Sequence, residues 1–346
     1  ASYKIGRFEE NAGMSDYGLR IFRDDGSFLT LNSETTVSKI LGVSRVPGDG
    51  LNLAKAPFNT GVVIPDGYDY YCWNSAPIAG YDRLSIGGPW GFHRRYSRLD
   101  GARRVLIDTT NTADYRIPAL FYAVIAWPTK TQQKATYGLE VLNGSALFRL
   151  TGDTSFSTEL FRGEVTIDYG WAPSRINPAF NRYNSVVFFY TTDPNVCISC
   201  HEEPQQINFY PVDISNAAPR SVRAKVVIFG TGNGGGGLQR DTYGLELYNN
   251  GVLAYNSGWR MLTRPILLNM NGMAQNSMTG VSGVRRPMYM PTGVGQCGVR
   301  KLYQRSDGFS IGAAMGRVSG EFAHSSPWFV GDSPLMVLDA EDYFSF

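Results

Sequence analysis

The chain is poor in the residues on which catalytic and metal-binding chemistry most often depends. Its 346 residues include 3 His and 4 Cys. None of His93, His201 and His324 lies in a recognisable nucleophile elbow. No second Cys-x-x-Cys pair accompanies Cys197 and Cys200 to complete a zinc site, and four cysteines are too few for a disulfide scaffold. We therefore expect a protein that is not an enzyme and that holds no metal and no cofactor.

The sequence also lacks long apolar runs and an excess of either charge. Its longest strongly apolar stretch, 117–127, is about half the length that a membrane-spanning helix needs. The 32 basic and 30 acidic residues leave a net charge of +2. Paired arginines at 94–95, 103–104 and 285–286 stand apart from one another. Because affinity for phosphate depends on many clustered cations, we expect neither nucleic-acid binding nor membrane insertion.

No signal peptide is recognisable at the start of the sequence. Ala1 is compatible with removal of an initiator Met and equally with a mature N-terminus after cleavage. These two origins imply different locations, and both stay open at this point.

Glycine, proline and aromatic residues are abundant instead. The chain contains 39 Gly and 18 Pro, and 13% of its residues are aromatic. Apolar runs are short and end in turn residues, as where Val62-Val63-Ile64 precedes Pro65-Asp66-Gly67. Segments with helical periodicity are few, and the best is a short turn over 33–41 with Ser33 as its cap. The pattern predicts an all-β chain with long loops and little helix.

One phrase recurs three times along the chain. Its copies begin Tyr17-Gly18-Leu19-Arg20, Tyr137-Gly138-Leu139-Glu140 and Tyr243-Gly244-Leu245-Glu246. Each continues into a polar turn that contains Gly and then into a second short apolar run. Large apolar side chains at alternate positions share one face of a strand, and Gly accepts the positive φ of a tight turn. Each copy therefore predicts a β-hairpin, preceded at a distance of about a dozen residues by another apolar strand.

The repeat spacing suggests how the chain is divided. A chain of this length favours two to three domains, and the copies begin at 17, 137 and 243. We expect consecutive β-sandwich-like domains over 1–121, 122–224 and 225–346. The first would carry a long aromatic-rich insertion and the third an extension beyond its hairpin.

The segment Cys197-Ile198-Ser199-Cys200-His201 matches the pattern for covalent attachment of c-type haem. In that interpretation both thiols bond to the porphyrin and His201 ligates the iron. The flanking Thr-Asp-Pro-Asn and Glu-Glu-Pro sequences are typical of a surface loop. A loop with reduced thiols or a local disulfide is the simpler interpretation.

Aromatic residues gather in turn-rich parts of the sequence. Alternation along 70–73 places Tyr71 and Trp73 on one face of a strand and Tyr70 on the other. Such a strand is buried between two layers or lies at a subunit interface, and aromatic platforms also bind sugar rings. Core packing is the alternative. Our candidate interaction surface comprises Tyr70, Tyr71, Trp73, Trp90, Phe92, Phe344 and Phe346.

The repeated phrase resembles the hairpins of tail-tip and tail-fibre-type structural proteins of tailed bacteriophages. The resemblance is clearest over 225–262 and 122–155, and it is weaker over 2–42, where Arg20 replaces the acidic residue. It covers about a third of the chain, counted on those three ranges. It implies a virion component at the distal tail and transfers no catalytic residue.

The resemblance implies assembly in the host cytoplasm into the phage tail, with a role in virion assembly and host attachment. Partners would be other copies of the chain, as a trimer, together with other tail proteins and a host receptor or glycan. Two alternatives are a carbohydrate-binding or glycan-degrading surface protein, with Trp73, Trp90 or Trp171 lining a cleft, and a secreted haem protein based on Cys197, Cys200 and His201.

Overall fold

The computed structural model describes residues 18–22, 28–32, 37–47, 56–81, 91–110, 120–129, 138–143, 146–151, 157–181, 183–202, 206–230, 246–249, 252–256, 258–297, 300–318 and 328–346. Strands dominate these residues, and the described helical segments are the short 3-10 turns η2 (Pro173–Arg175) and η3 (Ala340–Asp342). The prediction of an all-β fold with little helix is confirmed.

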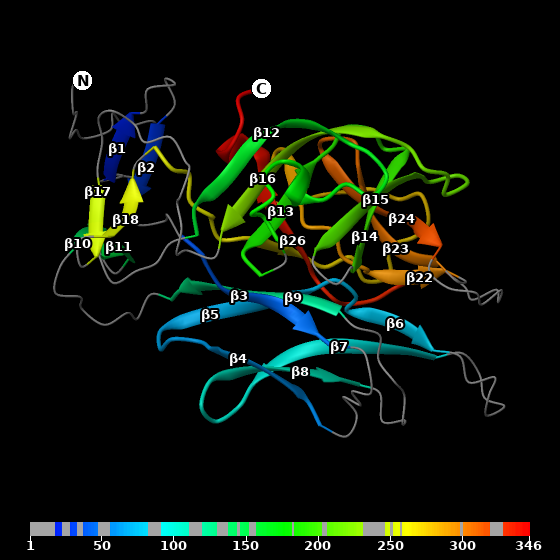
Figure 1. Cartoon of the computed structure of the whole chain (residues 1–346), viewed down its shortest axis with the longest axis horizontal. Helices are drawn as coiled ribbons and strands as arrows, with labels where there is room; N and C mark the ends of the chain where they lie inside the picture. Colours follow the sequence, from blue (N-terminus) through cyan, green and yellow to red (C-terminus); the bar gives the residue numbers. More distant parts are fainter. Residues whose placement is uncertain are drawn as a thin grey trace.

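A lower sandwich is formed by two antiparallel sheets, drawn in blue and cyan in Figure 1. The first sheet has the order β3 (Lys39–Val46), β9 (Leu120–Pro128), β5 (Tyr68–Asn74). The second has the order β4 (Phe58–Val63), β8 (Arg104–Thr109), β7 (Gly91–Leu99), β6 (Ile78–Tyr81). The core between the sheets contains Val46, Ile64, Cys72, Val105, Ile107, Leu120, Tyr122 and Val124.

An upper sandwich holds most of the remaining strands (Figure 1). One sheet has the order β12 (Glu159–Ile167), β16 (Val222–Gly230), β13 (Ser185–Tyr190), β21 (Pro287–Tyr289), β26 (Leu335–Asp339), β19 (Ile266–Leu268). The other has the order β15 (Ile207–Asp213), β14 (Val196–Glu202), β23 (Arg300–Ser306), β22 (Gly295–Cys297), β25 (Phe329–Val330), with β24 (Ser310–Val318) paired to β23 and to β20 (Thr279–Gly280). The rings of Phe189 and Phe209, one from each sheet, pack edge to face with centroids 4.7 Å apart.

Strand β9 joins the two sandwiches because it is buried on both faces. Leu120, Tyr122 and Val124 point into the lower core. Phe121, Ala123 and Ile125 point the other way and belong to the large core that continues into the upper sandwich. Alternate residues of a strand face opposite sides, so an uninterrupted apolar run is what a strand between two layers requires.

The three predicted hairpins are confirmed. They are β1 (Gly18–Phe22) with β2 (Phe28–Asn32), β10 (Gly138–Asn143) with β11 (Ala146–Thr151), and β17 (Glu246–Asn249) with β18 (Val252–Asn256). Figure 1 draws all three at the same end of the molecule, and β10 contacts β2. The tyrosine that begins each copy and the turn glycines lie outside the described residues.

The sheets cross both expected domain boundaries. Position 121 falls inside β9, which pairs with β3 and β5. Position 224 falls inside β16, and the two strands that pair with β16, β12 and β13, both precede that boundary in the sequence. The hairpins therefore do not each sit in a sandwich of their own. Instead, strands distant in sequence combine into two sandwiches beside one group of hairpins (Figure 1).

The short helical turn expected over 33–41 is wrong for the described part of that range. Residues 39–41 begin strand β3, because pairing with β9 and burial of Ile40 outweigh the weak helical pattern. Residues 33–36 lie outside the described residues.

Truncating a side chain of β9 tests its central position. We expect Phe121→Ala, at a site that is 0% exposed, to lower the free energy of unfolding by about 3–5 kcal/mol, because the cavity lies between two packed layers. The matched change Phe309→Ala, at a side chain that is 61% exposed, should cost about 1 kcal/mol or less. Urea unfolding of both variants at equal protein concentration measures the difference. Equal losses would contradict the assignment of β9 as the shared layer.

Candidate interaction surface

Among the aromatic residues of β5, Trp73 is buried in the core, and the partly buried tyrosines pack against the two cores. Trp73 is 1% exposed, and Tyr71 packs against the same large core. The Tyr71 hydroxyl donates to the carbonyl oxygen of Pro334 at 2.6 Å, and burial raises its pKa. Tyr70 packs on the opposite, lower core. The predicted division of faces is confirmed, but the inclusion of Trp73 in an interaction surface is wrong, because the strand lies between two layers.

The side chains of two further candidates, Trp90 and Phe92, are not among those that the structure describes. Trp90 lies outside the described residues, and Phe92 lies in β7 without a described side chain. Trp171, which the carbohydrate alternative requires in an open cleft, is 3% exposed and packs against Phe189 and Phe209. Neither Trp73 nor Trp171 therefore offers a ring face to a sugar.

The remaining candidates, Phe344 and Phe346, lie on a surface that mixes aromatic rings with cations. The Arg286 guanidinium carbon is 4.2 Å from the ring centroid of Phe346 and 5.3 Å from that of Phe309. The Lys225 ammonium nitrogen is 4.7 Å from the Phe346 centroid and 5.1 Å from that of Phe344. Such contacts contribute about 0.5–1 kcal/mol each at exposed sites. We call this surface the Phe–Arg patch: Tyr190, Lys225, Arg285, Arg286, Phe309, Phe344 and Phe346.

The patch remains open to solvent even though its members contact one another. Phe309 is 61% exposed and Phe346 is 53% exposed. Exposed large apolar side chains beside arginine are the composition that protein interfaces favour. The patch thus has the character of a contact surface.

Hydrogen bonds hold Arg286 in place between the rings. It donates to the Tyr190 hydroxyl at 3.3 Å and to the Glu341 carboxylate at 3.2 Å. These acceptors raise the pKa of Arg286 above its ordinary value, with the Tyr190 bond the largest cause. Asp339 supports the same region by accepting backbone N–H bonds from Arg285 and Arg286 at 2.8 and 3.3 Å.

Sequence reasoning missed most of the patch. Its residues come from β13, β16, the segment before β21, the turn before β24 and the chain beyond η3. The pair Arg285-Arg286 is visible in the sequence, but nothing local places Arg286 against Phe309 or Phe346. Only the pairing of distant strands brings these groups together.

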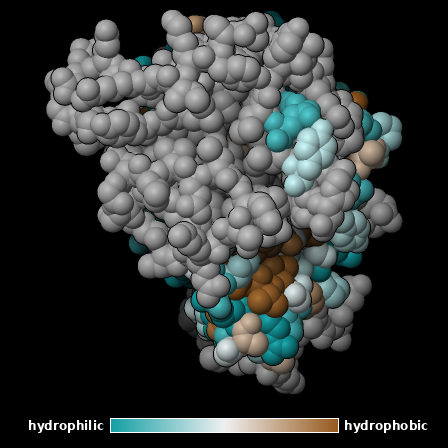
Figure 2. Space-filling model, turned by 90° about the vertical axis from the view of Figure 1, so that its left-hand side faces the viewer, coloured by the Kyte–Doolittle hydropathy of each residue, from teal (hydrophilic) through white to brown (hydrophobic). Residues whose placement is uncertain are grey.

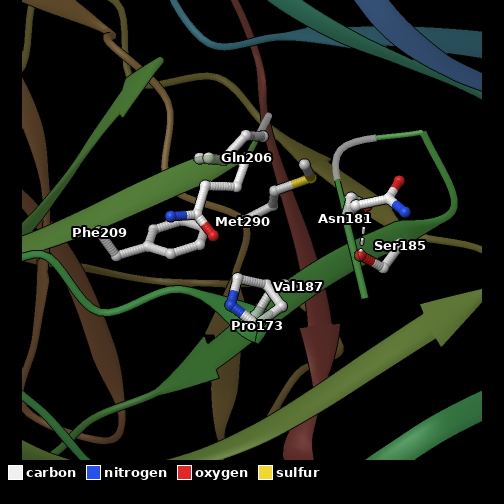
Figure 3. Close-up of a pocket in the computed structure, with 8 residues that line it drawn as sticks. Pro173, Asn181, Ser185, Val187, Gln206, Phe209 and Met290 are labelled. Atoms are coloured by element: carbon white, nitrogen blue, oxygen red, sulfur yellow. Dashed lines mark hydrogen bonds between the residues drawn. The ribbon is translucent and has the colours of Figure 1, made fainter. Parts of the chain in front are cut away.

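A separate hollow opens between β13, β15 and η2, with an empty volume of about 300 Å³ that includes solvent at its mouth. Figure 3 shows Pro173, Val187, Phe209 and Met290 around it, with Asn181 and Ser185 together on one side and Gln206 on another.

The polar groups of the hollow already have partners within the chain. The Ser185 hydroxyl donates to the Asn181 carbonyl oxygen at 2.8 Å, and the Ser174 hydroxyl donates to the Gln206 side-chain oxygen at 2.6 Å. The eight lining residues include no ionisable side chain. The lining therefore offers no ionisable group for acid–base chemistry, and its serine hydroxyl, that of Ser185, donates within the chain.

The Cys-x-x-Cys-His segment is not a surface loop but strand β14, which pairs with β15 over its whole length. The strand forms because Val196, Cys197, Ile198 and Cys200 are buried in the large core that β14 helps to build. Cys197 and Cys200 are three residues apart and so point to opposite faces. Their thiols donate to the carbonyl oxygens of Ala314 at 3.7 Å and Pro291 at 3.4 Å. This arrangement does not fit two thioether bonds to one porphyrin.

Other site chemistry is equally sparse in what the structure describes. No group of three or more His, Cys, Asp or Glu side chains among the described residues could hold a metal ion. The described part of the chain likewise contains no helix suited to spanning a membrane.

Comparison with known proteins yields one match. A model for a family of unknown function (DUF6453) matches residues 89–323. That range runs from β7 to β24 and includes the second and third hairpins, whereas Phe344 and Phe346 lie beyond it. No curated protein matches the chain, and no solved structure matches it.

The acidic side chains at η3 predict a pH dependence of stability. The pKa of the Asp342 carboxyl group is raised from 3.8 to about 6, mainly by partial withdrawal from water and then by the neighbouring Asp339 carboxylate. A folded-state pKa above the unfolded value means that stability is fully present below about pH 4 and is lost as pH rises through 6. Asp342→Asn should therefore raise the melting temperature at pH 7–8, and the gain should disappear near pH 4.

Thermal melts across this pH range measure the effect, with Asp168→Asn as the control at an exposed carboxylate elsewhere. A gain at neutral pH that persists unchanged at pH 4 would contradict the assigned cause.

The buried thiols predict slow chemical modification. None of the four cysteines forms a disulfide bond, Cys72, Cys197 and Cys200 are at most 5% exposed, and burial raises the pKa of Cys72 to about 12. Thiolates are the reactive form, so an aromatic disulfide reagent should label at most Cys297 in the folded protein and all four thiols after unfolding. Rapid labelling of Cys197 and Cys200 in the native protein would show that β14 is accessible.

Proposed function

The chain belongs to the family of unknown function DUF6453, and we propose that it is a structural component of a bacteriophage tail tip, baseplate or tail fibre. Its role there would be virion assembly and host attachment. We propose other copies of the chain, as a trimer, and other tail proteins as its partners, and the phage tail as its location.

The observation that carries this proposal is the common position of the three repeated hairpins. An isolated two-stranded hairpin is at best marginally stable in water, so a hairpin needs a neighbour to cover its apolar face. Figure 1 draws the three copies together, although they are contributed by chain segments beginning at 18, 138 and 246. The chain gathers its three repeated hairpins into one group, and the repeated hairpin phrase is the feature that it shares with structural proteins of phage tails.

The chemistry of the surface also supports a structural role. The Phe–Arg patch combines exposed rings with guanidinium and ammonium groups, which suits contact with another protein. The hollow beside β13 lacks ionisable side chains, and both cysteines of the CxxCH segment are buried in strand β14. The glycan alternative thus loses Trp73 and Trp171 as exposed ring faces, while Trp90 lies outside the described residues, and the haem alternative loses a pair of thiols on one face.

A virion experiment tests the proposal. Tailed particles purified from cells that carry the coding sequence should contain peptides of this chain by mass spectrometry. Gold-labelled antibodies raised against the purified protein should bind at the distal end of the tail in electron micrographs. Particles made without the chain should lack an intact tail tip or fail to adsorb. Detection of the chain only outside the particles would overturn the proposal.

A further inference from the structure

The acidic and basic groups at the Phe–Arg patch differ in the hydrogen bonds that they can still form. The side-chain carboxylates beside the patch, those of Asp307, Asp339 and Glu341, are occupied by donors of the same chain. Asp339 accepts three backbone N–H groups, from Arg285, Arg286 and Glu341. Glu341 itself lies 3.2 Å from Arg286 and 3.8 Å from Arg285.

Asp307, beside Phe309, is occupied in the same way. Its carboxylate accepts the backbone N–H groups of Phe309 at 2.9 Å and Ser310 at 2.7 Å. The acids of this surface therefore serve to shape it and offer little to a partner.

Two of the three cations, Lys225 and Arg285, retain most of their donors. The Arg285 side chain is 83% exposed and has one long contact, to Glu341. Lys225 lies over the two phenyl rings, and neither it nor Arg285 forms a short ion pair. An incoming surface must therefore bring carboxylates for these donors and an apolar group for the exposed rings of Phe309 and Phe346.

The chain carries such a surface at the turn between β4 and β5, which we call the acidic turn (residues 63–69). Val63 is 54% exposed, and the Asp66 side chain is 93% exposed. Asp69 also lies exposed, near the start of β5. Figure 2 shows hydrophobic residues (brown) reaching the surface of the lower sandwich on the side that faces the viewer.

The acidic turn is held rigid before any contact is made. Arg103 donates to the carbonyl oxygens of Ile64, Pro65 and Tyr68 at 2.9, 3.1 and 3.1 Å. Its distance to the Asp66 carboxylate is longer, at 3.4 Å, which leaves that carboxylate acceptor capacity. A preformed turn loses little conformational entropy on docking.

We propose that the Phe–Arg patch of one copy binds the acidic turn of a second copy, with Val63 against the phenyl rings and Asp66 and Asp69 against Lys225 and Arg285. Figure 1 draws the patch segment near the C-terminus above the upper sandwich and the β4–β5 connection on the lower sandwich. Because two different surfaces meet, the contact is head-to-tail. Successive copies joined in this way close into a ring when the rotation between neighbouring copies permits it. The inference rests on the proposed function, because it names the surfaces that would join the copies.

A protein fits the patch better than a glycan does. The neutral polar group of the patch, the Tyr190 hydroxyl, accepts a hydrogen bond from Arg286 and belongs to a residue that is 4% exposed, so a sugar hydroxyl group does not reach it. Phenyl rings beside arginine match the anchors of protein interfaces.

Charge exchange tests the pairing in the full chain. Sedimentation velocity over a range of protein concentrations should show that the unmodified chain associates. The patch reversal Lys225→Glu with Arg285→Glu, and the turn reversal Asp66→Lys with Asp69→Lys, should each weaken association by roughly tenfold or more. The chain that carries all four changes should associate again, because the two reversed surfaces match. Asp168→Lys, a reversal at an exposed carboxylate outside both surfaces, should leave association unchanged.

Each other outcome overturns the inference. An unmodified chain that stays monomeric at every concentration excludes a second copy as the occupant. Association that neither reversal weakens, or that the four changes fail to restore, assigns the contact to other surfaces. Circular dichroism of each variant separates loss of association from loss of fold. A monomeric chain that is nevertheless found in phage tails would reject this inference and leave the proposed function intact.

Discussion

Burial of β9 on both faces is the constraint on which the rest of the described structure depends. Phe121, Ala123 and Ile125 pack upward and Leu120, Tyr122 and Val124 pack downward, so the sheet β3–β9–β5 serves two cores at once. A packed interior resists changes in volume on either side. The lower and upper sandwiches thus share a layer rather than meeting through a linker, and the position of one determines the position of the other.

Polar groups complete the junction between the sandwiches. The Thr292 hydroxyl donates to the Asn74 carbonyl oxygen at 2.7 Å, and the Gly293 N–H donates to the Ser75 carbonyl oxygen at 3.1 Å. Within the lower sandwich, beside this junction, Arg95, which is 1% exposed, donates to the Ala76 carbonyl oxygen at 2.8 Å. Loss of the Arg95 guanidinium would leave that carbonyl oxygen without this donor. The junction is therefore specific as well as apolar.

Local patterns predicted local structure. The hairpins follow from alternation and turn residues within about fifteen residues, so they could be identified from the sequence. The two faces of β5 follow from the same alternation, and Tyr70, Tyr71 and Trp73 confirm it. The division into domains could not be found in this way, because the partner of β12 is β16, and β13 pairs with β21. Sequence spacing carries no record of such long-range pairing.

The same difference between local and long-range structure applies to the candidate site. The CxxCH motif suggested chemistry, but strand alternation separates its two thiols, which the motif alone does not reveal. The Phe–Arg patch draws on side chains from Tyr190 to Phe346, and its geometry follows from the assembled sheets. Sequence identified two of its phenylalanines and one arginine pair, and the fold supplied their neighbours.

The gathering of the three hairpins has a consequence for synthesis on the ribosome. The first hairpin, β1 with β2, contains its own pairing and can form early, but the third is not available until Asn256 has emerged. Long-range contacts of this kind slow folding, since a large loop must close before they contribute. Through much of translation the first hairpin therefore lacks the two other hairpins that Figure 1 draws beside it in the finished chain.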